Sequence, residues 1–166
     1  MNAVSDLCRE RHAELTGDTE DLAVRYRPNV PRHGDIGSDS DIEREFSEAL
    51  EATRGREMGT GSTAVGPHRD DFTLSADGVN MGTYASRGQA RTIGLSLRLA
   101  EAAYLKSVRG EEPILLLDDV LSELDSFRRS RVLEVALQYQ QVIITTTDLD
   151  SIRESDLGGA AYHEVS

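Results

Sequence analysis

The feature that most constrains the fold is a pair of short apolar runs separated by one amphipathic segment. The runs are Pro113-Ile-Leu-Leu-Leu117 and Gln141-Val-Ile-Ile-Thr145, and the periodicity between them predicts a helix over residues 127–139. An uninterrupted apolar run is typical of a strand covered on both faces, as in a parallel sheet. Because a helix between two strands returns the chain to the same end of the sheet, the strands should be parallel. We therefore expect an α/β fold.

The rest of the second half follows the same architecture. Residues 64–66 are expected to form a strand or an extended segment, and residues 71–81 should form a hairpin that turns at Asp77-Gly78, with Phe72, Leu74 and Ala76 on one face. A long helix is expected over residues 89–108. Its wide apolar face comprises Ile93, Leu97, Ala100 and Tyr104, with Leu95, Leu99 and Ala103 beside them.

The first half has a different rhythm. A helix should begin near Met1 and stop at Gly17, and alternation predicts a strand over residues 22–30, followed by a loop over residues 31–40. Ile42, Phe46, Ala49 and Leu50 indicate a second helix, with Ser40 or Asp41 as its N-cap and its end near Gly55. The Gly, Ser and Thr residues at 59–63 predict a boundary between residues 1–62 and residues 63–166.

Length and composition exclude several classes. A chain of 166 residues, 38% of them hydrophobic, has room for one ordinary domain, or for one domain with a small appendage. No apolar segment approaches the ~18 residues of a spanning helix, and no signal-peptide pattern follows Met1, so we expect a cytoplasmic protein. The single cysteine, Cys8, excludes an internal disulfide and offers little for zinc chemistry, and we expect it to be a partly buried small residue.

The net charge of this chain is opposite in sign to that of a typical DNA-binding domain. Thirty acidic residues against 18 basic ones give a net charge of −12, and neither half of the chain has a basic excess. Phosphate backbones are bound by an excess of Lys and Arg. We therefore expect any DNA surface to be local or to lie outside these residues.

The strongest chemical feature is the pair of acids, Asp118 and Asp119, directly after the first apolar run. Ligands of parallel sheets bind beyond the carboxyl ends of strands, where two carboxylates could hold a hydrated Mg²⁺ and polarise a water molecule. The alternative is a helix-capping acid at a strand–loop junction. The continuation Val120-Leu-Ser-Glu-Leu-Asp125 makes that alternative weaker.

A second feature opens the long helix at Ser86-Arg-Gly-Gln89. A serine hydroxyl, a glycine that admits a ligand and the free N–H groups of a first helical turn can bind an anion. Alone this signal is weak, because serine before a helix is usually an N-cap and Arg87 or Arg91 would usually be solvated.

The order of these motifs resembles the C-terminal portion of RecF-family proteins, bacterial recombination-repair ATPases of the ABC type that are related to the structural-maintenance and Rad50 proteins. The resemblance is strongest over residues 63–152. It rests on four ordered segments: Gly66-Pro-His-Arg-Asp-Asp71, Ser86-Arg-Gly-Gln89, Leu115-Leu-Leu-Asp-Asp-Val-Leu-Ser-Glu-Leu-Asp125 and Ile144-Thr-Thr-Thr-Asp148.

The resemblance implies specific roles for these residues. Asp118 would be the Walker B acid on Mg²⁺, Asp119 would orient the attacking water, and Thr147 would occupy the switch position. The remaining roles fall to three groups: the signature, which binds ATP held by the opposing subunit of a head-to-head homodimer (Ser86, Arg87, Gly88, Gln89), the D-loop (Ser122, Glu123, Leu124, Asp125), and a family motif of underived role (Gly66, Pro67, His68, Arg69, Asp70, Asp71).

One departure from the family pattern affects activity. The phosphate-binding loop Gly-x-x-x-x-Gly-Lys-[Ser/Thr] does not occur in these residues, and the only lysine, Lys106, lies in an expected helix. We therefore expect half of an ATP site, without ATPase activity of its own, in which residues 1–62 are the returning part of a helical arm. Smaller departures are Ala90, where relatives often have a polar residue, and Asp119, where most ABC enzymes have glutamate.

Three functions remain open from the sequence. The first is the signature and Walker B half of a RecF-like ATPase, which in the intact protein binds DNA at single-strand gaps and junctions and loads recombinase with mediator proteins. The second is a nucleotide-independent module that pairs with an ATPase head and regulates it. The third is a Mg²⁺-dependent nuclease or phosphatase that uses Asp70, Asp71, Asp118 and Asp119, which lacks a nucleophile or a histidine cluster beside the acids.

Overall fold

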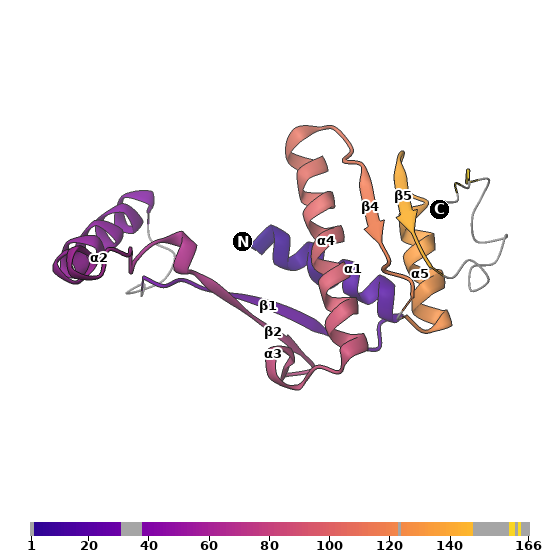
Figure 1. Ribbon diagram of the computed structural model, residues 1–166, viewed down its shortest axis with the longest axis horizontal. Coiled ribbons are helices and arrows are strands. Elements are labelled where there is room, and N and C mark those ends of the chain that lie inside the picture. The colour runs from indigo at the N-terminus through magenta and orange to yellow at the C-terminus, as the bar shows by residue number, and fades with distance from the viewer. Residues whose placement is uncertain (1, 31–37, 123, 148–159, 162, 164–166) are drawn as a thin grey trace. The chain divides into compact units, whose positions relative to one another are not determined.

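The computed structural model describes residues 2–30, 38–122, 124–147, 160–161 and 163. Its elements are mixed helix and strand, which confirms the α/β class (Figure 1): α1 (Asn2–Thr16), β1 (Leu22–Arg27), α2 (Asp39–Thr60), a 3₁₀ turn (Pro67–Arg69), β2 (Asp71–Ala76), β3 (Val79–Asn80), α3 (Met81–Tyr84), α4 (Arg87–Arg109), β4 (Leu115–Asp118), α5 (Ser126–Ala136) and β5 (Val142–Thr145). Two compact units divide the chain, residues 1–23 with 75–166 and residues 24–74. The predicted boundary at residues 62 and 63 stays a prediction about the intact protein.

The larger unit is built around one apolar core. Helix α1 packs against α4 and α5, and β4 pairs with β5 beside them (Figure 1). The core joins one residue of α1 to side chains of α4, β4, α5 and the segment between β4 and α5: Leu15, Leu95, Leu99, Leu115, Leu117, Leu121, Leu124, Val132, Leu133, Val135 and Ala136. Cys8 is fully buried, and burial raises the pKa of its thiol to about 11.

Strands β4 and β5 are parallel, as the two apolar runs predicted. Leu115 pairs with Val142 and Asp118 with Thr145, so both strands end at the same edge. The prediction that the first run is covered on both faces is wrong for this chain. Leu115 and Leu117 are buried, whereas Leu116 is 67% exposed and Ile114 is 55% exposed, because alternate side chains of a strand point to opposite faces.

Helix α4 begins and ends where its sequence indicates. The Ser86 hydroxyl accepts a hydrogen bond from the Gln89 N–H at 3.2 Å, and the side-chain oxygen of Gln89 accepts one from the Ser86 N–H at 3.0 Å. This reciprocal pair is a capping box. Gly110 ends the helix in the left-handed conformation, with φ 72°. Along α4 the apolar face is as predicted at Ile93, Leu95 and Leu99, whereas Tyr104 is 40% exposed.

The strands β1, β2 and β3 form a separate sheet in the order β1-β2-β3. Strands β2 and β3 are antiparallel and turn at Asp77-Gly78, as predicted. The segment 64–66 is not a strand, and α3, a single turn after the hairpin, was not predicted.

Helix α2 differs most from its prediction. It begins after Ser38, not at Ser40 or Asp41, and runs through Gly55 and Gly59 to its left-handed C-cap, Gly61. At Gly55 and Gly59 no neighbouring atom lies within 4 Å of the place where a methyl group would stand, so no close contact requires glycine there. A glycine inside an exposed helix lowers its stability by ~1 kcal/mol without ending it. The predicted loop over residues 31–40 lies largely outside the described residues.

Across the described part of the chain, no helix combines the length and apolar character that crossing a bilayer requires.

Candidate functional site

The two predicted acids lie at the carboxyl edge of the parallel pair, where a single threonine contacts both of them. The Thr145 hydroxyl donates a hydrogen bond to Asp118 Oδ1 at 2.5 Å. The Asp119 N–H donates to the Thr145 hydroxyl at 3.0 Å and to the Thr145 carbonyl at 3.2 Å. The side chain of Asp118 and the backbone of Asp119 are therefore held by the end of the neighbouring strand. Thr145 was not singled out from the sequence, although its place at the end of the second apolar run was a usable signal.

Asp119 has an uncommon backbone conformation, with φ 48°. Positive φ is costly for side chains with a Cβ, and Asn and Asp tolerate it best. The residue is solvent-exposed, and so is Asp118. The chain therefore bends sharply after β4. The backbones of the two successive acids, Asp118 and Asp119, have different conformations.

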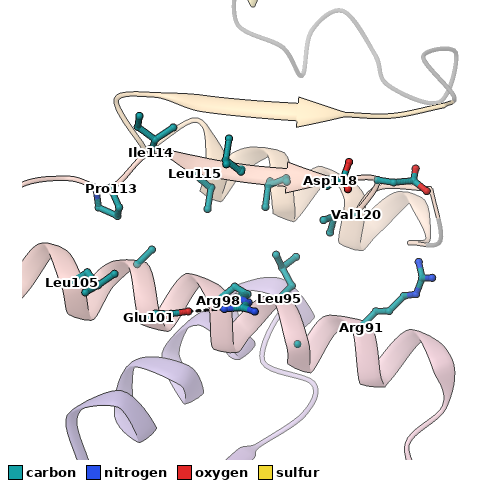
Figure 2. Close-up of a pocket in the computed structure, with 15 residues that line it drawn as sticks. Arg91, Leu95, Arg98, Glu101, Leu105, Pro113, Ile114, Leu115, Asp118 and Val120 are labelled. Carbon is teal, nitrogen blue, oxygen red and sulfur yellow. Dashed lines mark hydrogen bonds and ion pairs between the residues drawn. The ribbon is translucent and has the colours of Figure 1, made fainter. Parts of the chain in front are cut away.

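A groove of about 660 Å³ runs between β4 and α4. Figure 2 shows Asp118 at the end of β4 and Arg91 on α4 at the same end of the groove. Arg98 and Glu101 form an ion pair at 3.0 Å on the α4 wall. The lining of the groove is mixed: apolar side chains such as Leu95 and Leu117 lie beside the charged residues Arg91, Arg98, Glu101, Asp118 and Asp119.

The predicted signature residues begin α4. Ser86 and Gln89 form the capping box, and Gly88 lies at the first turn, where an added methyl group would stand 3.9 Å from Arg128 Nη1. The Arg87 side chain is exposed. The segment thus combines a capped helix start with an open position at glycine.

The predicted D-loop follows directly on the two acids. The Ser122 hydroxyl donates to the Asp119 carbonyl at 3.1 Å, Leu124 is buried, and Asp125 caps α5 by accepting the Arg128 N–H at 2.9 Å. Glu123 lies outside the described residues. The predicted switch residue, Thr147, is exposed shortly after β5 ends.

The family motif 66–71 lies in the smaller unit and makes its contacts there. Gly66 has φ 141°, and a methyl group there would approach the His68 ring to 2.9 Å, so this position requires glycine. Arg69 donates to the Thr63 carbonyl at 2.9 Å, and the Asn29 N–H donates to Asp70 at 2.7 Å. Tyr26 also hydrogen-bonds Asp70 through its hydroxyl. These contacts give Arg69 and Asp70 structural partners, whereas the Asp71 and His68 side chains are exposed.

The chemistry of the donors at the β4 edge fits a hard cation in part. Asp118 and Asp119 supply oxygen ligands, which Mg²⁺ prefers. Among the described residues, no group of three or more His, Cys, Asp or Glu side chains gathers to form a complete protein site. This pattern suits Mg²⁺ bound through one or two carboxylates, with phosphates and water completing its shell.

Sequence reasoning missed a third set of residues, the polar cluster around Glu20. Glu20 contacts His12 of α1, Gln89 of α4 and Arg128 of α5. The local sequence around Glu20 does not predict these contacts, since an acid soon after a helix-ending glycine is typical of a solvated loop.

Comparison with known proteins identifies the relatives of this chain. No family model matches it. It is 41% identical over 157 residues to DNA replication and repair protein RecF of Geobacillus kaustophilus (strain HTA426), which covers 93% of this chain and 41% of the relative. It is 38% identical over 165 residues to the protein of the same name from Synechococcus sp. (strain JA-3-3Ab), which covers 99% of this chain and 43% of the relative.

Solved structures agree with these relatives. "Structure of the recombination mediator protein RecF-ATP in RecFOR pathway" matches with a TM-score of 0.70 and 31% identity, covering 90% of this chain and 39% of the other. The corresponding structure described as RecF-ATPrS matches with a TM-score of 0.71. The chain spans about two fifths of the length of the relatives that it matches. Over the portion that it matches, the chain belongs to the RecF family.

Proposed function

We propose that this chain supplies the signature and Walker B half of a RecF-like ATP site. The observation that carries the proposal is the edge of the parallel pair, where Thr145 holds Asp118 by its side chain and Asp119 by its backbone. A fixed carboxylate at a strand end is the arrangement that P-loop ATPases use for Mg²⁺. Asp118 is the proposed cation ligand, and Asp119 is the residue proposed to orient the attacking water.

The start of α4 supplies the complementary function. Free N–H groups of a first helical turn and the positive end of the helix dipole favour an anion. The capping box fixes Ser86, and at Gly88 no side chain stands between the backbone and the Arg128 guanidinium. We propose that Ser86, Arg87, Gly88 and Gln89 contact the terminal phosphate of ATP held by the opposing subunit of a head-to-head homodimer, and that the D-loop and Thr147 lie along the same interface.

The exposed face of β4 and β5 supports the proposal that this half requires a second one. Ile114, Leu116 and Ile143 are each more than half exposed, although such residues are usually buried. A two-stranded sheet is marginal by itself. We propose that the part of RecF outside the matched length covers this face and brings the phosphate-binding loop.

DNA binding and mediator partners are proposed from the relatives alone. The solved relatives are described as recombination mediator proteins of the RecFOR pathway. By that kinship we propose binding to single-strand gaps or junctions and loading of recombinase. With a net charge of −12, the present chain should bind DNA poorly by itself. We therefore expect the DNA-binding surface to require the rest of the protein.

Complementation tests the proposed function. The purified chain is mixed with Mg-ATP alone, and then with the remaining part of a RecF relative as a separate polypeptide, while phosphate release is followed. We expect turnover only in the mixture, and Asp118→Asn should lower it roughly 100-fold or more, the scale of a lost electrostatic contact in catalysis. Glu134→Gln, on an exposed residue of α5, is the matched control.

Two outcomes would contradict the proposal. One is turnover by the chain alone that Asp118→Ala abolishes, which would mean that some other group replaces the phosphate-binding loop. The other is tight association of the chain with the second polypeptide without ATP dependence and without turnover. That result would favour a nucleotide-independent module that regulates an ATPase head through the exposed β4 face.

A further inference from the structure

Glu20 lies at the centre of a polar cluster behind the start of α4. Its side chain is only 15% exposed. Oε2 lies 3.3 Å from His12 Nε2, and Oε1 accepts from Gln89 Nε2 at 3.4 Å and from Arg128 Nη2 at 3.5 Å. A largely buried carboxylate is stable only when such donors replace water. The three donors come from α1, α4 and α5, so one carboxylate joins three helices.

His12 fixes the anchored end of this carboxylate. The His12 side chain is fully buried, and its Nδ1 lies 3.0 Å from the Ser96 hydroxyl, which also reaches the Thr92 carbonyl at 2.7 Å. A neutral ring can accept the Ser96 proton at Nδ1, and a charged ring can donate there while Ser96 donates to Thr92. In both of these states the Nε2–H faces Glu20, whereas the neutral tautomer with its proton on Nδ1 would set a lone pair against the carboxylate and is disfavoured by it. The histidine therefore holds Oε2 whether or not it is charged, and Oε1 remains for the two other donors.

The Gln89 amide is held at both of its ends. Its side-chain oxygen accepts from the Ser86 N–H at 3.0 Å, and its NH₂ group donates to Glu20. Rotation of the amide by 180° would place the NH₂ group against the Ser86 N–H and the oxygen against the carboxylate. Glu20 and the Ser86 N–H together determine which way Gln89 faces, and Gln89 in turn holds the backbone of Ser86.

Arg128 extends the same connection to the D-loop. Its Nη2 contacts Glu20, and its Nη1 donates to Asp125 Oδ2 at 3.2 Å. Asp125 is the N-cap of α5 and the last residue of the D-loop segment. The Arg128 guanidinium also lies beside Gly88. An unbroken chain of contacts therefore runs from Ser86 through Gln89, Glu20 and Arg128 to Asp125.

We propose that Glu20 is a positioning residue whose carboxylate couples the start of α4 to the D-loop, so that Ser86 and Asp125 hold one fixed spacing. The inference deepens the proposed function and rests on it for the roles of these two segments. Both are proposed to face the opposing subunit, and an interface made by two segments requires their separation to be set before the subunits meet. Glu20 acts through Gln89 and Arg128 and does not itself touch nucleotide.

Amide exchange in the 166-residue chain tests the coupling without ATP. The rate of exchange of the Ser86 N–H with water is measured by NMR in the parent chain and in Arg128→Ala. We expect Arg128→Ala to raise the rate at Ser86 at least about threefold, because Glu20 loses a donor and releases Gln89. In the Glu20→Ala background the same substitution should add no further change at Ser86.

The chain offers matched controls. Arg131→Ala removes an arginine of the same helix that pairs with Glu134 at 2.9 Å, and it should leave Ser86 unchanged. The Gly110 N–H, which donates to the Lys106 carbonyl at the far end of α4, should exchange at the same rate in every variant. An unchanged rate at Ser86 in Arg128→Ala, or an equal effect with and without Glu20, would overturn the coupling.

A conservative variant covers the case in which Glu20→Ala does not fold. Glu20→Gln keeps the size and one carbonyl oxygen of the side chain, while neutral His12 can accept from the new NH₂ group. The effect of Arg128→Ala on Ser86 should then be weaker than in the parent chain. An effect as large as in the parent would overturn the role assigned to the carboxylate.

A second readout separates this inference from the proposed function. In the complemented ATPase, Glu20→Gln should lower kcat several-fold and leave KM for ATP unchanged, because the cluster acts after nucleotide has bound to the other half. A raised KM with unchanged kcat would overturn the positioning role. If the parent mixture shows no turnover, the proposed function fails, while the exchange result still decides whether Glu20 couples the two segments.

Discussion

Helices α2 and α4 are nearly equal in length and have similar ends, yet they differ completely in what they bury. They have 22 and 23 residues, each follows a serine N-cap, and each ends at a left-handed glycine. Helix α4 buries seven residues, whereas α2, all of whose residues are described, buries none. The comparison shows that local signals set where a helix begins and ends, while packing decides how much each helix contributes to stability.

The largest expected difference between the helices comes from matched leucine truncations. Leu99 of α4 is 1% exposed, and Leu99→Ala should lower the free energy of unfolding by about 2–5 kcal/mol through lost contacts and a cavity. Leu50 of α2 is only half-buried, and Leu50→Ala should cost much less. Urea denaturation followed by circular dichroism measures both. Equal losses would mean that α2 has a buried partner in solution.

A smaller difference should arise at the N-caps. Ser86→Ala removes a hydroxyl that accepts the Gln89 N–H, and the cost should be about 1 kcal/mol. At α2, the Ser38 hydroxyl donates to Asp41 at 2.9 Å, and it is the Asp41 carboxylate that accepts the Ser38 N–H. Ser38→Ala therefore keeps that backbone contact, and it should cost less than Ser86→Ala in the same urea titration.

Substitution of an interior glycine by alanine should have the same effect on the stability of both helices. Gly55 of α2 and Gly94 of α4 both have open space where a methyl group would stand. Gly55→Ala and Gly94→Ala should each stabilise the helix by about 0.5–1 kcal/mol, because alanine loses less backbone entropy. Helix-resolved amide exchange can assign each gain to its own helix. A gain in only one of them would show that propensity is not independent of packing here.

The smallest expected effect depends on pH and again separates the two helices. Burial lowers the pKa of His12 below its usual 6.5, although Glu20 opposes the shift. The unfolded chain then binds more protons than the folded one just below pH 6.5, so stability should fall as the pH drops through 6.5 and be full above it. Hydrogen bonds from Ser38 and Arg44 lower the pKa of Asp41 below 3.8, so the stability that it gives α2 should be lost only at more acidic pH.

Urea midpoints at pH 7.5, 6.5 and 5.5 measure this dependence, and His12→Gln supplies the control. The parent chain should become less stable over this range, and the variant should show a flatter profile because it lacks the titrating group. A profile that is equally steep in the variant would assign the titration to a different residue.

The parts of the fold that are set by local sequence signals were predicted, whereas those that depend on exposure or on distant contacts were not. The long helix was predicted over residues 89–108, within two residues of the bounds of α4, and the parallel pairing of β4 and β5 was predicted correctly, because Ser86 and the apolar runs are local signals. The predicted end of α2 was wrong, because an exposed helix can pass through Gly55 at a modest cost in stability. The prediction that both faces of β4 are covered was also wrong for this chain. A pattern of apolar residues does not say which polypeptide supplies the covering residues.

The candidate site divides in the same way. Asp118 and Asp119 were predicted from their place after an apolar run, and the structure puts them at the expected strand edge. The contacts of Thr145 and Glu20 were not predicted. Glu20 meets Gln89 and Arg128, which are 69 and 108 residues away along the chain, and no local pattern reports contacts of that separation.

The backbone of Asp119 restricts which sequences this site can adopt. All three non-glycine residues with positive φ in the described ranges are aspartates: Asp18, Asp77 and Asp119. A short side chain that can hydrogen-bond locally is what makes this conformation accessible, and the longer glutamate lacks that compensation. The residue at this step is thus selected by torsion angle as well as by acidity. At this turn of the present chain, the short carboxylate of aspartate should therefore be favoured over glutamate, even though most ABC enzymes have glutamate at the matching position.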